Sequence, residues 1–110
     1  MNIFKLLDKQ GKRTIGVEFT PLLIKAGTVT RRLALHRLAG LWLVSDPQSG
    51  GRICEVAGSY RGIRVSSRDV GPREAARLAK AHLAEFIEKV TPDGFNQRLA
   101  AARAKYAAEA

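Results

Sequence analysis

The hydrophobic pattern of this chain changes its period near residue 70. Residues 13–66 are rich in β-branched side chains and carry apolar residues at alternate positions between frequent glycines, which is typical of half-buried strands. Residues 72–90 instead place apolar side chains three and four positions apart, the period of an amphipathic helix. Strands that come first and helices that come last predict an α+β fold, with an antiparallel sheet covered by helices on one face.

Several segments before the change of period have the features of single strands. Residues 15–20 alternate apolar with small or polar side chains. Two apolar runs, at residues 41–44 and 53–57, flank the turn-forming sequence Asp-Pro-Gln-Ser-Gly-Gly, which predicts a β-hairpin with a longer loop. Residues 61–67 complete the predicted sheet, which spans residues 13–66 and contains four to five strands.

Residues 28–39 fit two different structures. As a helix, the segment would begin at Thr28 as N-cap and end before Gly40, and its Leu, Ala and Arg content favours that structure. As a strand, it would place Val29, Arg31, Leu33, Leu35 and Arg37 on one face and Thr30, Arg32, Ala34 and His36 on the other. We favour the strand, because the segments on both sides also have strand patterns and a meander is continuous.

Three segments have a helical pattern. Residues 2–9 carry apolar side chains at the spacing of one or two helical turns and predict a short N-terminal helix. Residues 72–90 begin with a proline at the first helical position, and residues 94–108 form a second C-terminal helix after a Pro- and Gly-containing break. The expected architecture is therefore one domain over residues 1–110, in which the two C-terminal helices pack on one face of the meander sheet and leave the other face free.

Charge is the most unusual property of the composition. The chain has 19 Lys and Arg against 10 Asp and Glu, a formal net charge of +9. Residues 1–37 contain eight basic and two acidic residues, whereas residues 74–110 contain six and five. This excess favours a polyanionic partner, either nucleic acid or an acidic protein, and places the positive charge on the strands rather than on the helices.

Other features restrict the class of protein. Cys54 is the only cysteine, which rules out an intramolecular disulfide and fits a reducing cytoplasm. A signal-peptide pattern and a long apolar run are both missing, so we expect a cytoplasmic protein without a membrane partner. The sequence has no metal-ligand spacing, no cofactor motif and no nucleophile–base pattern, so we expect neither a cofactor nor a metal, and not an enzyme.

The most basic stretch, residues 58–69, suggests a binding surface on the last strand. Strand alternation would place Tyr60, Arg64 and Arg68 on one face. Arginine binds phosphate in bidentate fashion and tyrosine stacks on bases. The predicted nucleic-acid-binding residues are Arg31, Arg32, Arg37, Arg52, Tyr60, Arg61, Arg64 and Arg68.

Residues 60–64 (YRGIR) and 74–81 (EAARLAKA) resemble a strand and the helix of the plant ethylene-response-factor type of DNA-binding domain. The resemblance implies that Arg61 and Arg64 would read the major groove from a sheet. The chain departs from that family, because the strand runs almost directly into the helix and leaves no room for the family's two later strands. We therefore assign no family on this resemblance.

The sequence thus predicts a small basic accessory or regulatory protein that binds nucleic acid through an arginine-rich sheet face, with DNA and RNA left open. The alternative is an interaction or inhibitor protein of the kind that phages and mobile elements encode, which binds a host protein or nucleoprotein complex and could form a homodimer. In that case the partner surface would comprise Phe95, Leu99 and Tyr106 on the last helix.

Overall fold

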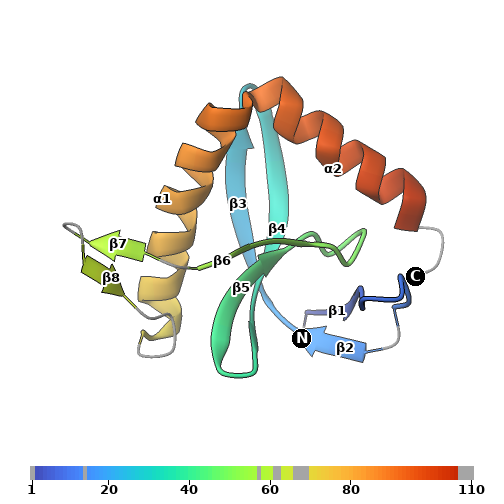
Figure 1. Cartoon of the computed structure of the whole chain (residues 1–110), viewed down its shortest axis with the longest axis horizontal. Helices are drawn as coiled ribbons and strands as arrows, with labels where there is room; N and C mark the ends of the chain where they lie inside the picture. The colour runs from blue at the N-terminus through green and yellow to red at the C-terminus, as the bar shows by residue number, and fades with distance from the viewer. Residues whose placement is uncertain (1, 14, 57, 61–62, 66–69, 107–110) are drawn as a thin grey trace.

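The computed structural model describes residues 2–13, 15–56, 58–60, 63–65 and 70–106, and only the backbone of residues 58–60 and 63–65. The described elements run in the order β1 (Ile3–Leu6), β2 (Ile15–Glu18), β3 (Thr20–Ala26), β4 (Val29–Leu38), β5 (Leu41–Ser45), β6 (Arg52–Glu55), β7 (Gly58–Tyr60), β8 (Ile63–Val65), α1 (Pro72–Val90) and α2 (Pro92–Tyr106). The two helices diverge from the tip of the β3–β4 hairpin, and the two small hairpins β1–β2 and β7–β8 lie at opposite ends of the molecule (Figure 1).

The central sheet is an antiparallel meander in the order β3-β4-β5-β6, which confirms the predicted α+β architecture. The segment with two interpretations, residues 28–39, forms strand β4 up to Leu38 and pairs with both neighbours. Its turn into β5 consists of Ala39 and Gly40, both with positive φ. Two such residues form the tight turn that matches the twist of a hairpin, so the strand interpretation is confirmed and Gly40 belongs to a turn rather than to a helix cap.

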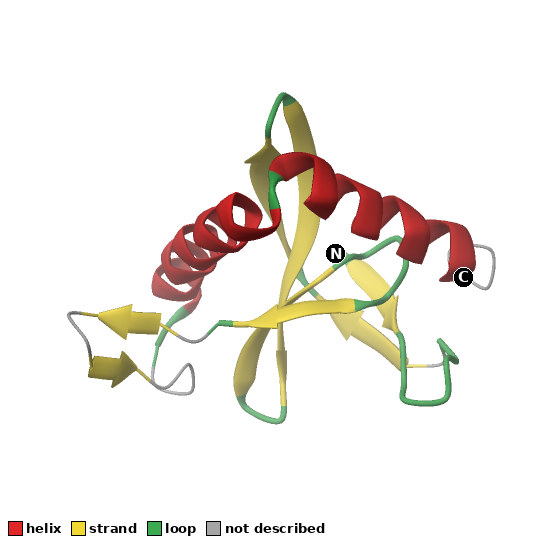
Figure 2. Ribbon diagram, turned by 45° about the horizontal axis from the view of Figure 1, so that its top comes forward, coloured by secondary structure: helices red, strands yellow, loops and turns green. Residues whose placement is uncertain are grey.

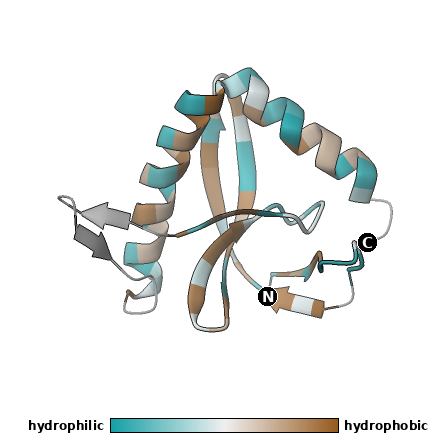
Figure 3. Ribbon diagram, viewed as in Figure 1, coloured by the Kyte–Doolittle hydropathy of each residue, from teal (hydrophilic) through white to brown (hydrophobic). Residues whose placement is uncertain are grey.

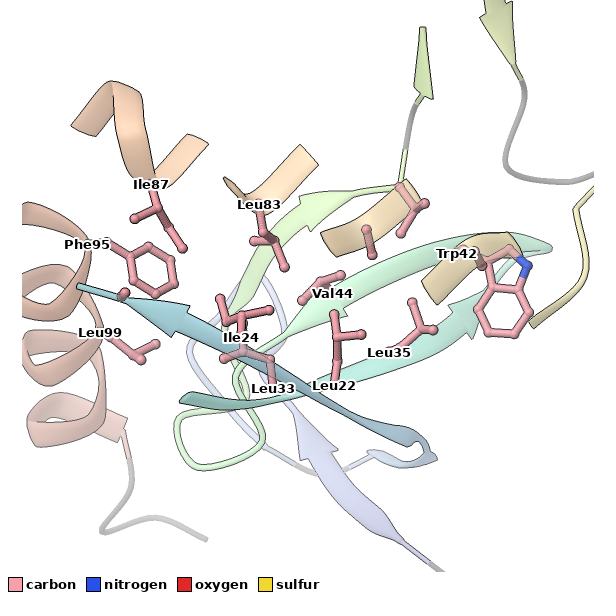
Figure 4. Packing of buried hydrophobic residues seen from close by; sticks show 14 residues of the cluster. Leu22, Ile24, Leu33, Leu35, Trp42, Val44, Leu83, Ile87, Phe95 and Leu99 are labelled. Atoms are coloured by element: carbon pink, nitrogen blue, oxygen red, sulfur yellow. The ribbon is translucent and has the colours of Figure 1, made fainter. Parts of the chain in front are cut away.

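Both C-terminal helices cover the same face of this sheet, as Figure 2 shows. We call it the helix face. Side chains from the strands and from α1 and α2 meet there in one continuous core (Figure 4). The strand members are Leu22, Ile24, Ala26, Leu33, Leu35, Trp42 and Val44, and the helix members are Ala75, Ala79, Leu83, Ile87, Phe95 and Leu99. Figure 3 shows the apolar residues of α1 alternating with polar ones along the helix, as its amphipathic pattern predicts.

The helix boundaries agree closely with the sequence pattern. Helix α1 spans the predicted residues 72–90. Helix α2 begins at Pro92, two residues before the predicted start, and its predicted end at residue 108 lies outside the described residues. Thr91 separates the helices with a φ of 70°, and its hydroxyl oxygen accepts a hydrogen bond from the backbone N–H of Gly94 at 3.1 Å. One residue therefore ends α1 and caps the start of α2.

The predicted helix at residues 2–9 is wrong. Residues Ile3–Leu6 form strand β1, which pairs antiparallel with β2. Two turns of helix are marginal in water, whereas the strand gains a hydrogen-bonded partner and buries Phe4 at 4% exposure. Tertiary packing therefore outweighs the local helical spacing of the apolar residues.

Candidate nucleic-acid interface

The second face of the central sheet, which we call the opposite face, is not free as predicted. Phe4 of the β1–β2 hairpin packs against it, with its ring centroid 5.1 Å from that of His36 and 5.5 Å from that of Phe19. Ala34, His36, Leu43 and Ser45 alternate with helix-face residues along β4 and β5, and all four are buried. The hairpin therefore covers the central part of this face with a second, smaller packed layer.

The three predicted arginines of β4 lie on two different faces. Arg31 is on the helix face and donates to the Oδ1 of Asn96 on α2 at 2.9 Å, while the amide nitrogen of Asn96 donates to the carbonyl oxygen of Ala26 at 3.2 Å. Arg31 therefore helps to dock α2. Arg37 also lies on the helix face, and Arg32 on the opposite face, because side chains alternate along the strand.

The other predicted residues do not form one described patch. Arg52 is exposed at the start of β6. Arg61 and Arg68 lie outside the described residues, as do the side chains of Tyr60 and Arg64. In the alternative partner surface, Phe95 and Leu99 are 3% and 5% exposed. Both are part of the core, so the prediction that they form a surface is wrong, and only Tyr106 remains half-buried at the end of α2.

A concave site with a volume of about 410 Å³ lies between the β1–β2 hairpin, β4 and the β5–β6 loop. We call it the hairpin groove. Its lining consists of Ile3, Phe4, Lys5, Arg13, Phe19, Arg32, Pro47 and Gln48. Three of these residues are cationic and none is acidic, so a ligand that enters the groove meets aromatic surface and uncompensated positive charge together.

Arg13 forms the floor of the hairpin groove and is itself buried at 6% exposure. Its guanidinium donates to the carbonyl oxygens of Lys5 (2.9 Å), Gln48 (2.7 Å), Pro47 (3.2 Å) and, more distantly, Tyr106 (3.5 Å). Carbonyl oxygens satisfy the N–H groups but do not neutralise the charge. Among the described residues, Arg13 has no carboxylate partner, so its positive charge is retained under the groove.

Gly50 explains how Arg13 and β1 approach the β5–β6 loop so closely. A Cβ at this position would lie 2.4 Å from the carbonyl oxygen of Lys5 and 2.7 Å from the Nε of Arg13. Its φ of 76° also favours glycine. The backbone N–H of Leu7 donates to the carbonyl oxygen of Gly50 at 2.9 Å. The predicted loop glycine is thus where the N-terminal hairpin attaches to the sheet.

The same loop is attached to α2 by a buried ion pair. Asp46 is 1% exposed, and Arg103 donates to both of its carboxylate oxygens at 3.0 and 3.1 Å. Burial alone would raise the pKa of Asp46, but hydrogen bonds from Arg103, the Ser49 side chain and the Gln48 backbone N–H outweigh burial, and the net pKa is lowered. The carboxylate is therefore ionised and holds the groove wall to the last helix.

The exposed Arg32 and the half-buried Phe19 form one wall of the hairpin groove. The Cζ of Arg32 lies 5.5 Å from the centroid of the Phe19 ring, within the range of a cation–π contact. Its guanidinium also donates to the Oδ1 of Asn2 at 3.3 Å. The exposed cation is therefore held over an aromatic ring rather than extended freely into solvent.

A second hollow of about 310 Å³ adjoins the first, because Phe19 lines both. We call it the end hollow. Its lining consists of Glu18, Phe19, Thr20, Leu35, His36, Arg37 and Trp42. Here the Cζ of Arg37 lies 4.6 Å from the Trp42 ring centroid. Arg37 and the indole N–H of Trp42 both donate to the carbonyl oxygen of Val70, at 3.2 and 3.0 Å.

His36 and Ser45 form a buried polar pair behind these hollows. The Nε2 of His36 lies 2.7 Å from the Oγ of Ser45, and Nδ1 has no hydrogen-bond partner among the described residues. Burial disfavours the charged imidazolium and lowers the pKa of His36, against a weaker opposing influence of the Arg37 backbone. Since no acid in the described part of the chain orients the ring and the residue is 1% exposed, the pair has the features of packing rather than of a reactive dyad.

Other chemistry receives little support from the part of the chain that the structure describes. No group of His, Cys, Asp and Glu within it could hold a metal ion, and no helix within it is long and apolar enough to cross a membrane. Burial raises the pKa of the Cys54 thiol to about 11, with a smaller opposing effect of Arg52, so the thiol is protonated at neutral pH. No known protein family, curated protein or solved structure matches the chain.

Sequence reasoning missed three residues of the hairpin groove: Lys5, Arg13 and Phe19. The sequence pattern places Lys5 in a helix that does not form, and Arg13 at the start of the predicted sheet. Phe19 belongs to the alternating pattern of residues 15–20, but it falls between β2 and β3, where the chain passes from one sheet to the next. The available signal was the charge itself, since residues 1–37 carry most of the net positive charge.

Proposed function

We propose that this protein is a small cytoplasmic, non-enzymatic accessory or regulatory protein that binds nucleic acid. The observation that carries the proposal is the hairpin groove, in which Lys5, Arg13 and Arg32 surround aromatic side chains and no acidic residue lines the wall. The net charge of +9 adds long-range attraction to any polyanion. Phosphate binding by such cations is expected to dominate affinity.

The proposed interface differs from the arginine-rich sheet face expected from sequence. Arg32 and Arg37 remain in it, at the hairpin groove and the end hollow respectively. Arg31 is not part of the proposed interface, because its guanidinium donates a hydrogen bond to Asn96. The arginines of residues 58–69 stay candidates for additional phosphate contacts.

The experiment is a titration of labelled DNA and RNA oligonucleotides with the protein, followed by fluorescence anisotropy at several salt concentrations. We expect binding at low salt and a linear fall of log K with log salt, with a slope that reports the number of phosphates neutralised. Lys5→Ala together with Arg32→Ala should reduce both the affinity and the slope. Binding that is undetectable at low salt would refute the proposal.

A second candidate function has its own observation. Ile3, Ile15 and Leu23 are 58–60% exposed on the N-terminal hairpin and on β3, and large apolar side chains in contact with solvent favour a protein partner. An interaction or inhibitor protein, including a homodimer, would bind through one or more of these side chains. Ile15→Ser with Leu23→Ser should then disrupt a complex seen by analytical ultracentrifugation, whereas nucleic-acid binding should be unaffected, because neither residue lines the hairpin groove or the end hollow.

A further inference from the structure

The hairpin groove and the end hollow have the same construction. Each contains an arginine over an aromatic ring, with Arg32 over Phe19 in the first and Arg37 over Trp42 in the second. Phe19 lines both hollows and therefore separates two adjacent sites. A repeated cation–aromatic arrangement is what a ligand with repeated planar groups and repeated charges would require.

The guanidinium of Arg32 is held in a position in which a base could stack on it. The ring of Phe19 on one side and the Oδ1 of Asn2 at 3.3 Å restrict the guanidinium, yet the residue is exposed. Bases stack on guanidinium planes as well as on aromatic rings. Because the group is already positioned, little conformational entropy is lost when a base stacks on it.

The floor of the hairpin groove offers a place for phosphate next to that stacking surface. Lys5 is exposed at its edge. Arg13 uses four of its five N–H groups on carbonyl oxygens, so among the described residues one N–H remains without a partner. A nucleotide whose base stacks on Arg32 and Phe19, and whose phosphate lies near Lys5 and Arg13, would use both the stacking surface and the positive charge of the groove.

The size and lining of the hollows favour separated nucleotides over a double helix. Volumes of about 410 and 310 Å³ lie at the small end of ligand sites. Proteins read duplex DNA by inserting a helix or ribbon into its groove, whereas here the cations surround concave sites. The end hollow also contains Glu18, whose carboxylate can accept a hydrogen bond from the exocyclic amino group of a base.

Building on the proposed function, we infer that the ligand is single-stranded nucleic acid. One unstacked base lies on Arg32 and Phe19 in the hairpin groove, with its phosphate toward Lys5 and Arg13. The neighbouring nucleotide of the same strand lies against Arg37 and Trp42 in the end hollow. The protein thus recognises bases by stacking and the strand by charge.

The test compares probes that separate bases from phosphates. The wild-type protein is titrated with a short single-stranded oligonucleotide, the same strand as a duplex, the same strand with abasic sites in place of its bases, a mononucleotide, and heparin. We expect the single strand to bind at least about tenfold tighter than the duplex or the abasic strand, because stacking on protein side chains contributes that much per base.

Three variants then locate the effect. Phe19→Leu keeps an apolar side chain beside Phe4 but removes the ring, and Arg32→Lys keeps the charge but removes the planar group. Each should weaken single-strand binding by about tenfold and leave abasic-strand binding nearly unchanged. Lys25→Ala, an exposed cation on β3 that lines neither hollow, is the matched control. Circular dichroism establishes that each variant is folded.

The outcomes separate the two proposals. Equal affinity for the single strand, the abasic strand and heparin, or tighter binding of the duplex, would overturn the single-strand inference and leave nucleic-acid binding in place. If a mononucleotide binds as tightly as the single strand, the inference that the ligand is a strand would be overturned, and a free nucleotide would be the ligand instead. Failure of every polyanion to bind would refute both.

Discussion

The two faces of the central sheet use the same strands for different purposes. On the helix face, side chains of β3, β4 and β5 join those of α1 and α2 in one apolar core. On the opposite face, a small hairpin covers a buried histidine–serine pair and borders the cationic hairpin groove, while the end hollow also includes Arg37 and Trp42 of the helix face. Alternation along a strand therefore lets a short chain combine an apolar core on one face with exposed cations on the other.

The comparison also shows how the hairpin groove arises. The β1–β2 hairpin contacts the opposite face through Phe4. The hairpin groove lies beside this contact, and the loop with Asp46 and Gly50 holds the hairpin and α2 in fixed relation to it.

The sharpest test of the difference uses two neighbouring leucines of β3. Leu22 is 3% exposed on the helix face, and Leu23 is 58% exposed on the opposite face. Leu22→Ala should lower the free energy of unfolding by about 3 kcal/mol, because it leaves a cavity in the core. Leu23→Ala should change it by less than about 0.5 kcal/mol. Urea denaturation measures both, and similar losses would mean that the faces are not organised as described.

A smaller effect is expected from the ion pair that fixes the loop. Arg103→Ala leaves the buried Asp46 carboxylate without its partner and should cost about 2 kcal/mol, less than a fully buried pair because the Arg103 side chain is 19% exposed. Arg98→Ala, an exposed arginine on the same helix, is the control and should have little effect. Thermal unfolding of both variants provides the comparison.

The Asp46–Arg103 ion pair also predicts that the free energy of unfolding depends on pH in the acid range. The pKa of Asp46 is lower in the folded protein than its ordinary value of 3.8. Its stabilising contribution is therefore fully present above that value and is lost as the pH falls through the lower folded pKa. Arg103→Ala should make this acid-side loss smaller, and an unchanged pH profile in the variant would contradict the assigned role.

The smallest predicted effect concerns the buried histidine. Burial lowers the pKa of His36 below its ordinary value of 6.5, so the unfolded chain binds more protons than the folded one in that range. The free energy of unfolding should then decrease as the pH falls below 6.5 and level off above it. His36→Gln should flatten this slope, with His82→Gln on α1 as the control. Urea titrations across that pH range measure the effect. If His36 were not responsible, the free energy of unfolding of His36→Gln would change with pH as steeply as that of the wild type.

Local patterns predicted the elements whose partners lie nearby or whose pattern is long. The boundaries of α1 followed from nineteen residues of helical periodicity and a proline at its start. Strand β4 followed from its neighbours, although its Leu, Ala and Arg content favoured a helix. The helix prediction for residues 2–9 was wrong because a strand of four residues has too few positions to distinguish a period of two from one of 3.6.

The candidate site was less predictable than the fold. The excess of positive charge indicated a polyanionic partner, but the position of each arginine depended on the tertiary structure. Arg31 became a docking residue for α2, Arg32 a wall of the groove, and Arg13 a buried floor residue. Alternation separates Arg31 from Arg32 in any strand, yet which face each helix or hairpin would cover could not be read from the pattern.

The sequence by itself determined that the meander strands precede two C-terminal helices, and it determined the excess of positive charge and the amphipathic face of α1. These properties depend on period and composition along a single stretch of chain. Only the tertiary structure decided that the N-terminal segment is a strand, that Phe4 covers the opposite face, and that Lys5, Arg13 and Arg32 surround one groove. Those outcomes depend on contacts between residues far apart in sequence, whose packing energies local propensities do not contain.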